Sequence, residues 1–423
     1  MAIAATGAVS MSDLRAEFVG GSAAISFSSL YRGGSHIRQK AGNNTSTNLA
    51  ASVPTSGAIN YTNFRSTAKG FRKTYTSGAT NQNASSVFGD DYGVNYPKEI
   101  VINSGVELGA TSTGEEALQI NSGLSGTMTI TNNGTLSGAG GSANGGAGGD
   151  AFEANVACTL INNGTIRAGG GGGGRGGNGG TGGTGGQGRS TYTNYGSWTN
   201  NTYPGGWGST LNVLPHAGSV QVRNASVNGG SIVSVQIRAS NYSTILGSAY
   251  GSSGYAYYAG PSASNAYYIH GAASNSNGDP RGFTGGSYQY RSVSTGTNYH
   301  NGGSGGGGGA GGNGGRGQGY NHGKQNGSGG SGGANGSGGG TNAGSGGRGG
   351  TGGTGGNGGT YGNGGGNGAS GATGNSGGNG NHTNGSGGSG GAGGSSGGAA
   401  GKYIRGLSNV TFTNNGTVQG GTA

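Results

Sequence analysis

Aromatic residues are concentrated in residues 190–300, in a background of serine, glycine and asparagine. This stretch holds both Trp residues and 13 of the 21 Tyr residues of the 423-residue chain. Tyrosine gives a large, rigid contact surface at low entropy cost, and small polar residues adapt around it. Arginine adds a donor that pairs with phosphate or carboxylate groups. This composition predicts an adhesive surface, with the following candidate contact residues: Trp198, Trp207, Tyr255, Tyr257, Tyr258, Tyr267, Tyr268, Arg281, Tyr288, Tyr290 and Arg291.

The alternative interpretation is that these aromatic residues form the small core of this stretch or a subunit contact. Residues 219–223 and 234–238 alternate apolar and polar side chains, which predicts two half-buried strands with a turn at residues 228–230. The repeated Ala-Tyr-Tyr at 256–258 and 266–268 puts adjacent tyrosines on opposite faces of an extended segment. We therefore expect at least one Tyr of each pair to be exposed.

The acidic residues give little support to catalysis. After Glu153 the only acidic residue is Asp279, so a glycosidase would have to draw its two carboxylates from the first 153 residues. The adjacent acidic pairs in that part, at 90–91 and 115–116, would point to opposite faces of a strand. The six His residues show no ligand spacing, and Cys158 lies in a strand pattern typical of a buried thiol. We expect no catalytic residue, no metal site and no cofactor.

The charge distribution divides the chain. Residues 1–153 hold 9 Lys and Arg and 10 Asp and Glu, whereas residues 154–423 hold 12 basic residues and one acidic residue. A basic distal part favours anionic partners such as phosphorylated glycolipid. Nucleic-acid binders usually cluster their basic residues on one face, and here only Arg65–Lys73 is clustered, so we expect no nucleic-acid partner.

Glycine must build much of the structure that carries the adhesive stretch. Apolar residues make up only 29% of the chain, too few for one large hydrophobic core, while 115 residues are Gly. Two glycines separate Asn178, Thr181, Thr184 and Gln187 from one another, and the same period of three recurs within residues 302–401. A left-handed extended helix has three residues per turn and no internal hydrogen bonds. Such helices can bond to each other through bare backbones, which predicts packed polyglycine II helices; a disordered linker is the alternative.

The first 75 residues contain an internal repeat. Gly7–Arg15 is echoed by Gly57–Arg65, and each copy reads as an extended piece followed by a cap, Ser10 or Asn60, that opens a helical turn. Leu14 and Phe18 then form a small apolar face. A repeated motif at this end suits docking to a larger assembly, and a small packing domain without a partner is the alternative.

This N-terminal stretch resembles the N-terminal segment of many structural tail and fibre proteins of tailed bacteriophages. The resemblance is carried by Thr6–Arg15, by Glu17 and Phe18, by Leu30–Gly34, and by Pro54–Ile59. It implies that this segment attaches the chain to the virion through other tail proteins. The candidate attachment residues are Leu14, Arg15, Phe18, Tyr31, Phe64 and Arg65.

Short strands with Asn-Gly turns follow. Residues 76–100 read as polar and irregular. The unit Ile130–Leu136 returns as Leu160–Ile166 and again as Phe412–Val418, which predicts strand rungs of a β-solenoid. The last copy lies some 250 residues after its nearest relative. We therefore expect the chain to leave the rungs near Gly169 and to return so that residues 405–420 pair beside 156–168.

The combination of strand units and glycine runs resembles the receptor-binding tips of phages. The examples are the adhesins at the long-fibre tips of T-even-type phages and the glycine-rich distal domains of siphophage tail-tip proteins. Thr159–Gly174, the Gly-Gly-x runs and Thr411–Gly421 carry the resemblance. It implies a layer of polyglycine II helices that holds loops against the host surface.

The predicted fold is mainly β with irregular structure. Its parts are an N-terminal attachment domain (1–75), a linker and rung region (76–168), glycine segments (169–189 and 301–401), an aromatic-rich β insert (190–300) and a returning C-terminal strand (402–423). The predicted function is a phage tail fibre or tail-tip receptor-binding protein, and not an enzyme. A purely structural tail component and an ice-binding protein are the alternatives.

The expected partners and location follow from this function. The N-terminus should bind other phage tail proteins, and the distal part should bind a host surface glycan, lipopolysaccharide or an outer-membrane protein. A homotrimer is expected, with a monomer as the alternative. The start of the sequence lacks the basic region of a signal peptide, and no stretch approaches ~18 apolar residues. We expect synthesis in the host cytoplasm and a final location in the virion tail.

Overall fold

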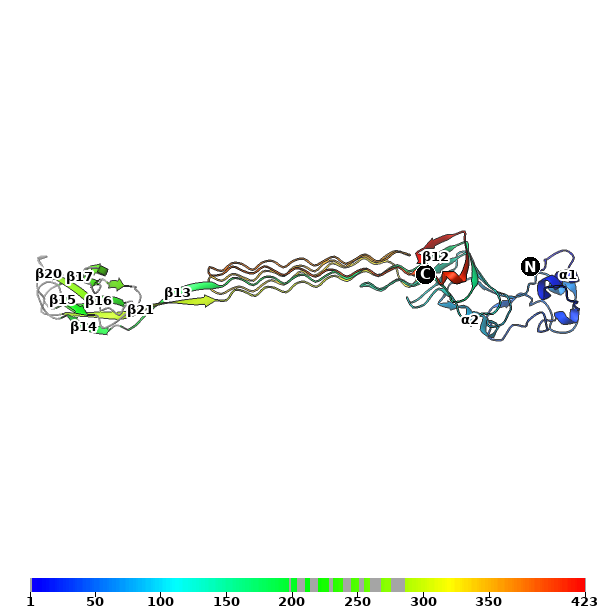
Figure 1. The fold of residues 1–423 in the computed structure, drawn as a ribbon, viewed down its shortest axis with the longest axis horizontal. Helices are drawn as coiled ribbons and strands as arrows, with labels where there is room; N and C mark the ends of the chain where they lie inside the picture. The colour runs from blue at the N-terminus through cyan, green and yellow to red at the C-terminus, as the bar shows by residue number, and fades with distance from the viewer. Residues whose placement is uncertain are drawn as a thin grey trace.

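The structure is a computed structural model that describes residues 2–197 and 295–422 with their side chains. Between them it describes the backbone of strands within residues 199–294. The fold is mainly β with few short helices, which confirms the predicted class. Figure 1 shows an elongated molecule in which the N-terminal helices, a body of short strands and a long glycine-rich rod follow one another.

The N-terminal domain is built from short capped helical turns around a small apolar core. The predicted caps are confirmed: Ser10 caps α1 (Met11–Leu14) and Asn60 caps η3 (Tyr61–Phe64). Two further turns, η1 (Arg15–Val19) and η2 (Phe27–Leu30), complete the set. Their apolar side chains meet in one buried cluster: Ile3, Leu14, Phe18, Leu30, Ile37, Ala50, Val53 and Phe64.

Residues 71–167 and 402–422, with the short strand of residues 47–48, form three mainly parallel sheets around a common core. The chain visits the sheets in turn, so that each circuit adds one strand to each sheet. The first sheet contains β1 (Thr47–Asn48), β2 (Phe71–Tyr75), β5 (Lys98–Ile102), β8 (Met128–Asn132), β11 (Cys158–Asn162) and β23 (Val410–Asn414). The second contains β3 (Ala79–Thr80), β6 (Glu107–Gly109), β9 (Thr135–Ser137), β12 (Thr165–Arg167) and β24 (Thr417–Gln419). The third contains β4 (Gln82–Asn83), β7 (Leu118–Ile120), β10 (Phe152–Ala154), β22 (Lys402–Arg405) and β25 (Gly421–Thr422).

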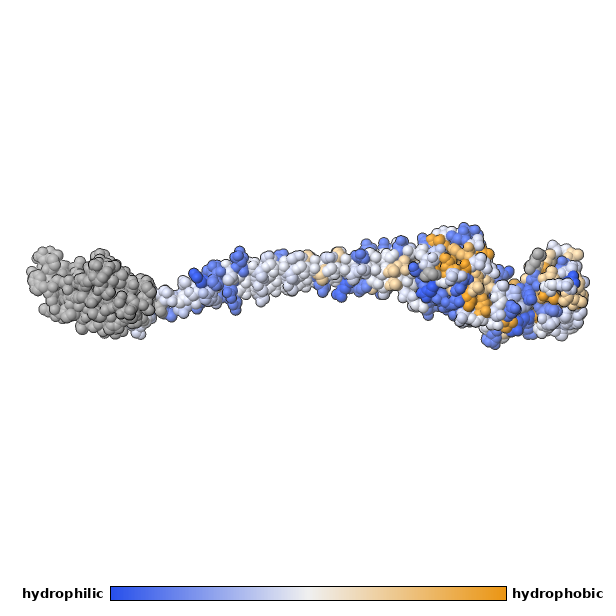
Figure 2. Space-filling model, viewed as in Figure 1, coloured by the Kyte–Doolittle hydropathy of each residue, from blue (hydrophilic) through white to orange (hydrophobic). Residues whose placement is uncertain are grey.

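The prediction that residues 76–100 are irregular is wrong. This stretch contains β3, β4, the helix α2 (Ala84–Phe88), the turn η4 (Gly89–Asp91) and the start of β5. The apolar positions are sparse, which hid the pattern, but Ala84, Val87 and Phe88 are all buried in the sheet core. In Figure 2 the apolar residues gather on the sheet body and the N-terminal domain, whereas the rod is mostly pale with hydrophilic patches.

The predicted return of the chain is confirmed. β23 pairs in parallel with β11 so that Leu160 lies opposite Phe412, and β24 pairs with β12. A short helix, η5 (Leu407–Asn409), joins β22 to β23. The repeated Asn-Asn-Gly units also stack, because Asn132 Nδ2 donates to Asn162 Oδ1 at 2.7 Å, within the buried interior. The sequence repeat therefore marks equivalent positions on successive circuits.

The glycine-rich residues pack as six extended segments, bonded to one another through their backbones. Gly173, Gly176 and Gly179 donate to carbonyls of the segment 301–319 at 2.8 Å, and the next residue of each triplet donates to the segment 363–380. The bonding partners define two layers of three segments that alternate in direction. One layer holds 301–319, 169–188 and 383–401, and the other holds 324–340, 343–361 and 363–380.

The third residue of each glycine triplet is exposed, as predicted. Thr181, Thr184 and Gln187 are all exposed, while the glycines between them are buried or half-buried. The exposed residues still have bonded amides, because Ser389 Oγ accepts from Thr181 N at 2.7 Å and Ser386 Oγ accepts from Thr184 N at 2.8 Å. The serines of the last segment thus satisfy donors that face away from the glycine layers.

Among the described residues beyond the rod, nine strands form two antiparallel sheets. One contains β13 (Gly188–Tyr195), β14 (Thr199–Tyr203), β16 (Val220–Val227), β19 (Tyr255–Tyr258) and β21 (Gly286–His300). The other contains β15 (Thr210–Val213), β17 (Ser231–Arg238), β18 (Ile245–Tyr250) and β20 (Tyr268–Ser274). The two echoed stretches are strands, as predicted, but they are not a hairpin: β16 pairs with β19 and β21, whereas β17 pairs with β18 and β20.

Candidate functional site

The rod leaves the sheet body at one corner, where the second sheet passes to the third. The connections there are residues 110–117 after β6, 138–151 after β9 and 168–401 after β12, so successive circuits carry longer insertions. The connection 138–151 supports the rod, because Gly172 N donates to Gly146 O at 2.7 Å and Gly148 N donates to Ala399 O at 2.9 Å. The distal strands are therefore carried by a rod whose base is hydrogen-bonded to the sheet body.

Two tyrosines in rod turns pack on the second sheet. The Arg167 guanidinium lies 3.9 Å from the centre of the Tyr361 ring and donates to Glu107 Oε1 at 2.9 Å. The ring of Tyr320 covers Gly109, because a β-carbon there would lie 2.0 Å from Tyr320 Cγ. These contacts fix two of the returning turns against strands β6 and β12, so the sheet body sets the direction of the rod.

A buried acidic cluster binds the returning chain at the same corner. Arg405 forms ion pairs with Glu116 at 3.3 Å and Glu153 at 3.5 Å, and also with Asp150. Lys402 N donates to Asp150 Oδ1 at 2.5 Å. Burial raises the pKa of Glu116 to about 7, assisted by the negative charges of Glu153 and Asp150 and opposed by Arg405. Three carboxylates share one guanidinium, so the cluster is sensitive to pH.

The predicted contact residues fall in the distal sheets. Tyr255, Tyr257 and Tyr258 lie on β19, Tyr268 starts β20, and β21 carries three more. The side chains of these strand residues lie outside the described part, and so do Trp198, Trp207, Tyr267 and Arg281 entirely. Their role as contact residues stays a prediction. The β21 members of this set are Tyr288, Tyr290 and Arg291.

The described base of the distal sheets presents further aromatic residues that the sequence analysis did not single out. Tyr192 and Tyr195 on β13 are 41% and 52% exposed, and Tyr299 on β21 is 59% exposed. The Tyr299 ring contacts the His382 ring at 4.8 Å, on the turn between two rod segments. Tyr192 and Tyr195 are three residues apart and therefore lie on opposite faces of the strand, so no alternation along 192–195 could have marked an exposed face in the sequence.

The candidate attachment residues divide into two groups. Leu14, Phe18 and Phe64 are at most 1% exposed and form the domain's own core, so any part they have in attachment is through the fold of the domain, and their role in attachment stays a prediction. Arg15, Tyr31 and Arg65 are half-buried and remain able to reach a partner. Two of them also hold the domain together, since Arg65 donates to Gly7 O at 2.7 Å and Tyr31 Oη donates to Gly57 O.

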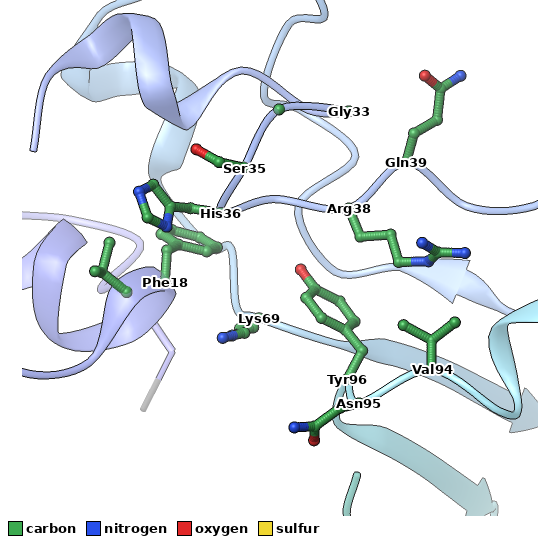
Figure 3. Close-up of a pocket in the computed structure, with 12 residues that line it drawn as sticks. Phe18, Gly33, Ser35, His36, Arg38, Gln39, Lys69, Val94, Asn95 and Tyr96 are labelled. Atoms are coloured by element: carbon green, nitrogen blue, oxygen red, sulfur yellow. The ribbon is translucent and has the colours of Figure 1, made fainter. Parts of the chain in front are cut away.

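A pocket of about 520 Å³ lies where the N-terminal domain meets the sheet body (Figure 3). Its lining includes the cationic or titratable side chains of His36, Arg38 and Lys69, with the ring of Tyr96 between them. Tyr96 is 4% exposed, so its ring forms a buried wall of the pocket. Arg38 is anchored from behind by Asp91, at 2.5 Å. The pocket therefore suits an anionic group.

Other kinds of site find no support in the described residues. No cluster of His, Cys, Asp and Glu there is arranged to hold a metal ion. Cys158 is buried, and burial raises the pKa of its thiol to about 11, so it is unreactive. The helices of the described part are too short and too polar to span a bilayer.

A comparison with protein families matches residues 70–288 to the family described as phage tail fibre adhesin Gp38. The match covers half of the chain. This protein belongs to the phage tail fibre adhesin Gp38 family. The matched residues of this Gp38-family chain run from β2 through the outgoing glycine segment to the start of β21. Residues 1–69, which form the N-terminal domain, lie outside the match.

Membership of the Gp38 family confirms the predicted resemblance to a phage tail fibre adhesin. The comparison with curated proteins and the comparison with solved structures find no match. The family thus indicates the virion tail as the location of this Gp38-family chain.

Proposed function

We propose that this chain attaches a phage tail fibre to the host cell surface through the distal sheets of residues 190–300. The observation that carries the proposal is the path of the chain. Residues 169–188 run outward from the sheet body, and residues 301–319 return along them through backbone bonds such as Gly185 N to Gly303 O. The distal sheets are therefore presented at one end of the rod, and the N-terminal domain lies at the other (Figure 1).

We propose that the glycine segments are polyglycine II helices and that the three sheets form a β-solenoid. The period of three in donors and acceptors supports the first assignment, because a helix with three residues per turn presents the same face at every third residue. The parallel pairing of successive circuits supports the second. Both are stiff, so a binding event at the tip acts directly on the fibre.

The distal surface is proposed to bind a host glycan, lipopolysaccharide or an outer-membrane protein, without catalysis. Exposed tyrosines at its base, Tyr192, Tyr195 and Tyr299, support aromatic contact with sugar rings or protein. The basic charge of the second half of the chain favours an anionic surface. The opposite end is proposed to dock to another tail protein, with Arg15 and the cationic pocket around Lys69 as contacts.

A replacement tests the distal assignment. Phages that carry a chain with residues 196–292 replaced by a short Gly-Ser loop keep the pairing of Gly188 with His300 at the end of the rod. These particles should assemble with normal yield and lose adsorption to the host. Normal adsorption would overturn the proposal and favour a purely structural role. Thermal unfolding of the purified variant controls for damage to the rod.

A further inference from the structure

A two-stranded ribbon joins the rod to the distal sheets. It consists of β13 and residues 293–300 of β21, which pair antiparallel to each other. β14 and β16 pair with β21 only at residues 286–292, so within the described strands nothing else pairs along the ribbon (Figure 1). Residues 191–195 and 297–299 are all exposed. The ribbon therefore presents its faces to the surroundings.

One face of the ribbon carries an exposed tyrosine beside an exposed arginine. Tyr299 lies directly opposite Arg189, and the β-carbons of such a pair lie about 5 Å apart on the same face. Tyr299 is 59% exposed, and Arg189 is exposed as well. The next two pairs on this face, here called the ribbon face, are exposed threonines: Thr191 with Thr297 and Thr193 with Thr295. The ribbon face thus combines an aromatic ring, a guanidinium group and a row of hydroxyl groups.

A turn at the end of the rod holds Arg189 and Tyr299 in place. Asn381 Oδ1 accepts from Arg189 N at 2.6 Å, and Asn381 Nδ2 donates to Arg189 O at 2.9 Å. The next residue, His382, donates its backbone N–H to Gln187 O at 3.1 Å, and its ring centre lies 4.8 Å from that of Tyr299. A two-stranded ribbon alone is only marginally stable, so these contacts fix its first residue pair on the rod. A ligand that binds there orders little additional backbone.

The positive charge of Arg189 has no acidic partner in the described part of the chain. The last acidic residues there, Asp150 and Glu153, pair with Arg405 in the sheet body at the other end of the rod. A guanidinium group pairs with both oxygens of a phosphate or carboxylate group. The arginine is therefore available to an anionic ligand, and the neighbouring ring of Tyr299 offers an apolar face to the same ligand.

We infer that the ribbon face binds an anionic saccharide, with a sugar ring stacked on Tyr299 and its phosphate or carboxylate group paired with Arg189. The threonine pairs extend this site along the strands by roughly 13 Å, at about 3.3 Å per residue, and bond the hydroxyl groups of a longer saccharide. A protein partner is less suited, because the centre of a protein interface is apolar and the centre of the ribbon face is threonine.

A ligand-observed NMR titration of the purified full-length chain tests the class of ligand. Glucose 6-phosphate and glucuronate are the anionic probes, and they separate a phosphate from a carboxylate as the recognised group. At least one of them should bind about tenfold more tightly than glucose and than inorganic phosphate, because only an anionic sugar uses both the ring and the guanidinium group. Failure of both probes to bind would overturn the inference, and so would equal affinity for glucose or for inorganic phosphate.

Two pairs of substitutions test whether the binding is on the ribbon face. Tyr299→Ala should weaken binding of the anionic probe about fivefold or more, whereas Tyr192→Ala, at a 41% exposed tyrosine on the opposite face, should not change it. Arg189→Gln should weaken binding at least about tenfold, whereas Arg175→Gln, at an exposed arginine on the rod, should not. Tyr299→Phe should bind as the unaltered chain does, because stacking uses the face of the ring. Unchanged binding in either Tyr299→Ala or Arg189→Gln would overturn the inference.

The saccharide site rests on the proposed attachment to the host, and the two have separate readouts. Adsorption of phages in which residues 196–292 are replaced decides the attachment, because the replacement removes the distal sheets. The titration of the full-length chain decides the saccharide site. Lost adsorption together with an absence of probe binding would overturn only the saccharide site, whereas normal adsorption together with probe binding on the ribbon face would overturn only the attachment through the distal sheets.

Discussion

Asn162 Nδ2 donates a 2.7 Å hydrogen bond to Asn414 Oδ1, although 252 residues separate the two side chains. The bond joins the last circuit before the rod to the first circuit after it. Asn162 is also the acceptor for Asn132 and is 0% exposed, so it is the buried middle member of a ladder whose last member, Asn414, is exposed. The rod and the distal sheets are thereby an insertion into a body whose two halves bond to each other directly.

Asn162→Ala should destabilise the sheet body by about 1–3 kcal/mol, because it leaves buried amide groups of the ladder without partners. The neighbouring Asn163 makes a parallel ladder with Asn133 and Asn415 but is exposed. Asn163→Ala is therefore the control, and its cost should stay near ~0.5 kcal/mol. Denaturant unfolding of both variants measures the difference, and equal costs would contradict the role of burial.

Substitution of two adjacent glycines should have different effects on the packing of the glycine rod. A β-carbon on Gly391 would lie 2.1 Å from Gly371 O, whereas a β-carbon on Gly390 meets nothing within 4 Å. Gly391→Ala should force the segments apart and cost about 1–3 kcal/mol. Gly390→Ala should be neutral or slightly stabilising, because it restricts only the unfolded chain. The rate of amide hydrogen exchange in the rod should rise in the Gly391 variant and stay unchanged in the Gly390 variant. Equal exchange rates in the two variants would indicate a flexible linker instead of a packed rod.

A larger side chain at Gly352 should have the same effect in another layer of the rod. Its β-carbon would lie 2.0 Å from Ala310 O, so Gly352→Val should open the rod. Gly329→Val is the matched control, because a β-carbon there meets no atom within 4 Å. Limited proteolysis should cleave the rod of the first variant and leave that of the second intact. Resistance of both variants would contradict close packing at Gly352.

The acidic cluster should make stability depend on pH. The pKa of Glu116 is raised above its unfolded value of 4.5 to about 7, mainly by burial. Its contribution to stability is therefore present below about pH 4.5 and is lost as the pH rises through about 7. Glu116→Gln should remove this loss and stabilise the chain at pH 8 by roughly 1–3 kcal/mol. Glu115→Gln, at the exposed neighbour, should leave the pH profile of the melting temperature unchanged.

Removal of the Arg167 side chain should loosen the base of the rod. Arg167 packs on Tyr361, pairs with Glu107 and donates to Ser137 Oγ at 2.8 Å. Arg167→Ala should cost about 1–2 kcal/mol and speed amide exchange at Gly362, whose N–H donates to Ala168 O nearby. Arg175→Ala is the control, because that side chain is exposed on the rod. Unchanged exchange at Gly362 in the Arg167 variant would contradict the anchoring role.

Local patterns in the sequence determined several parts of this protein. A period of three in the glycine runs sets which residues face outward, since bare backbones approach closely only where side chains are absent, as at Gly176 and Gly353. The caps Ser10 and Asn60, and the repeated Asn-Asn-Gly units that pair β11 with β23, were also readable, because each depends on a few adjacent residues.

Only the tertiary structure decided the rest, because it depends on contacts between residues far apart in the chain. The short turns of the N-terminal domain carry apolar or aromatic residues that differ in burial. Leu14 and Phe64 are buried in the core, whereas Met11 and Tyr61 keep an exposed part. A further capped turn, opened by Ser26, follows Ala23 where the two repeated copies carry glycine, and it became visible through its capping bonds. The strands of residues 71–83, with few apolar residues, form because the next circuit supplies their hydrogen-bond partners.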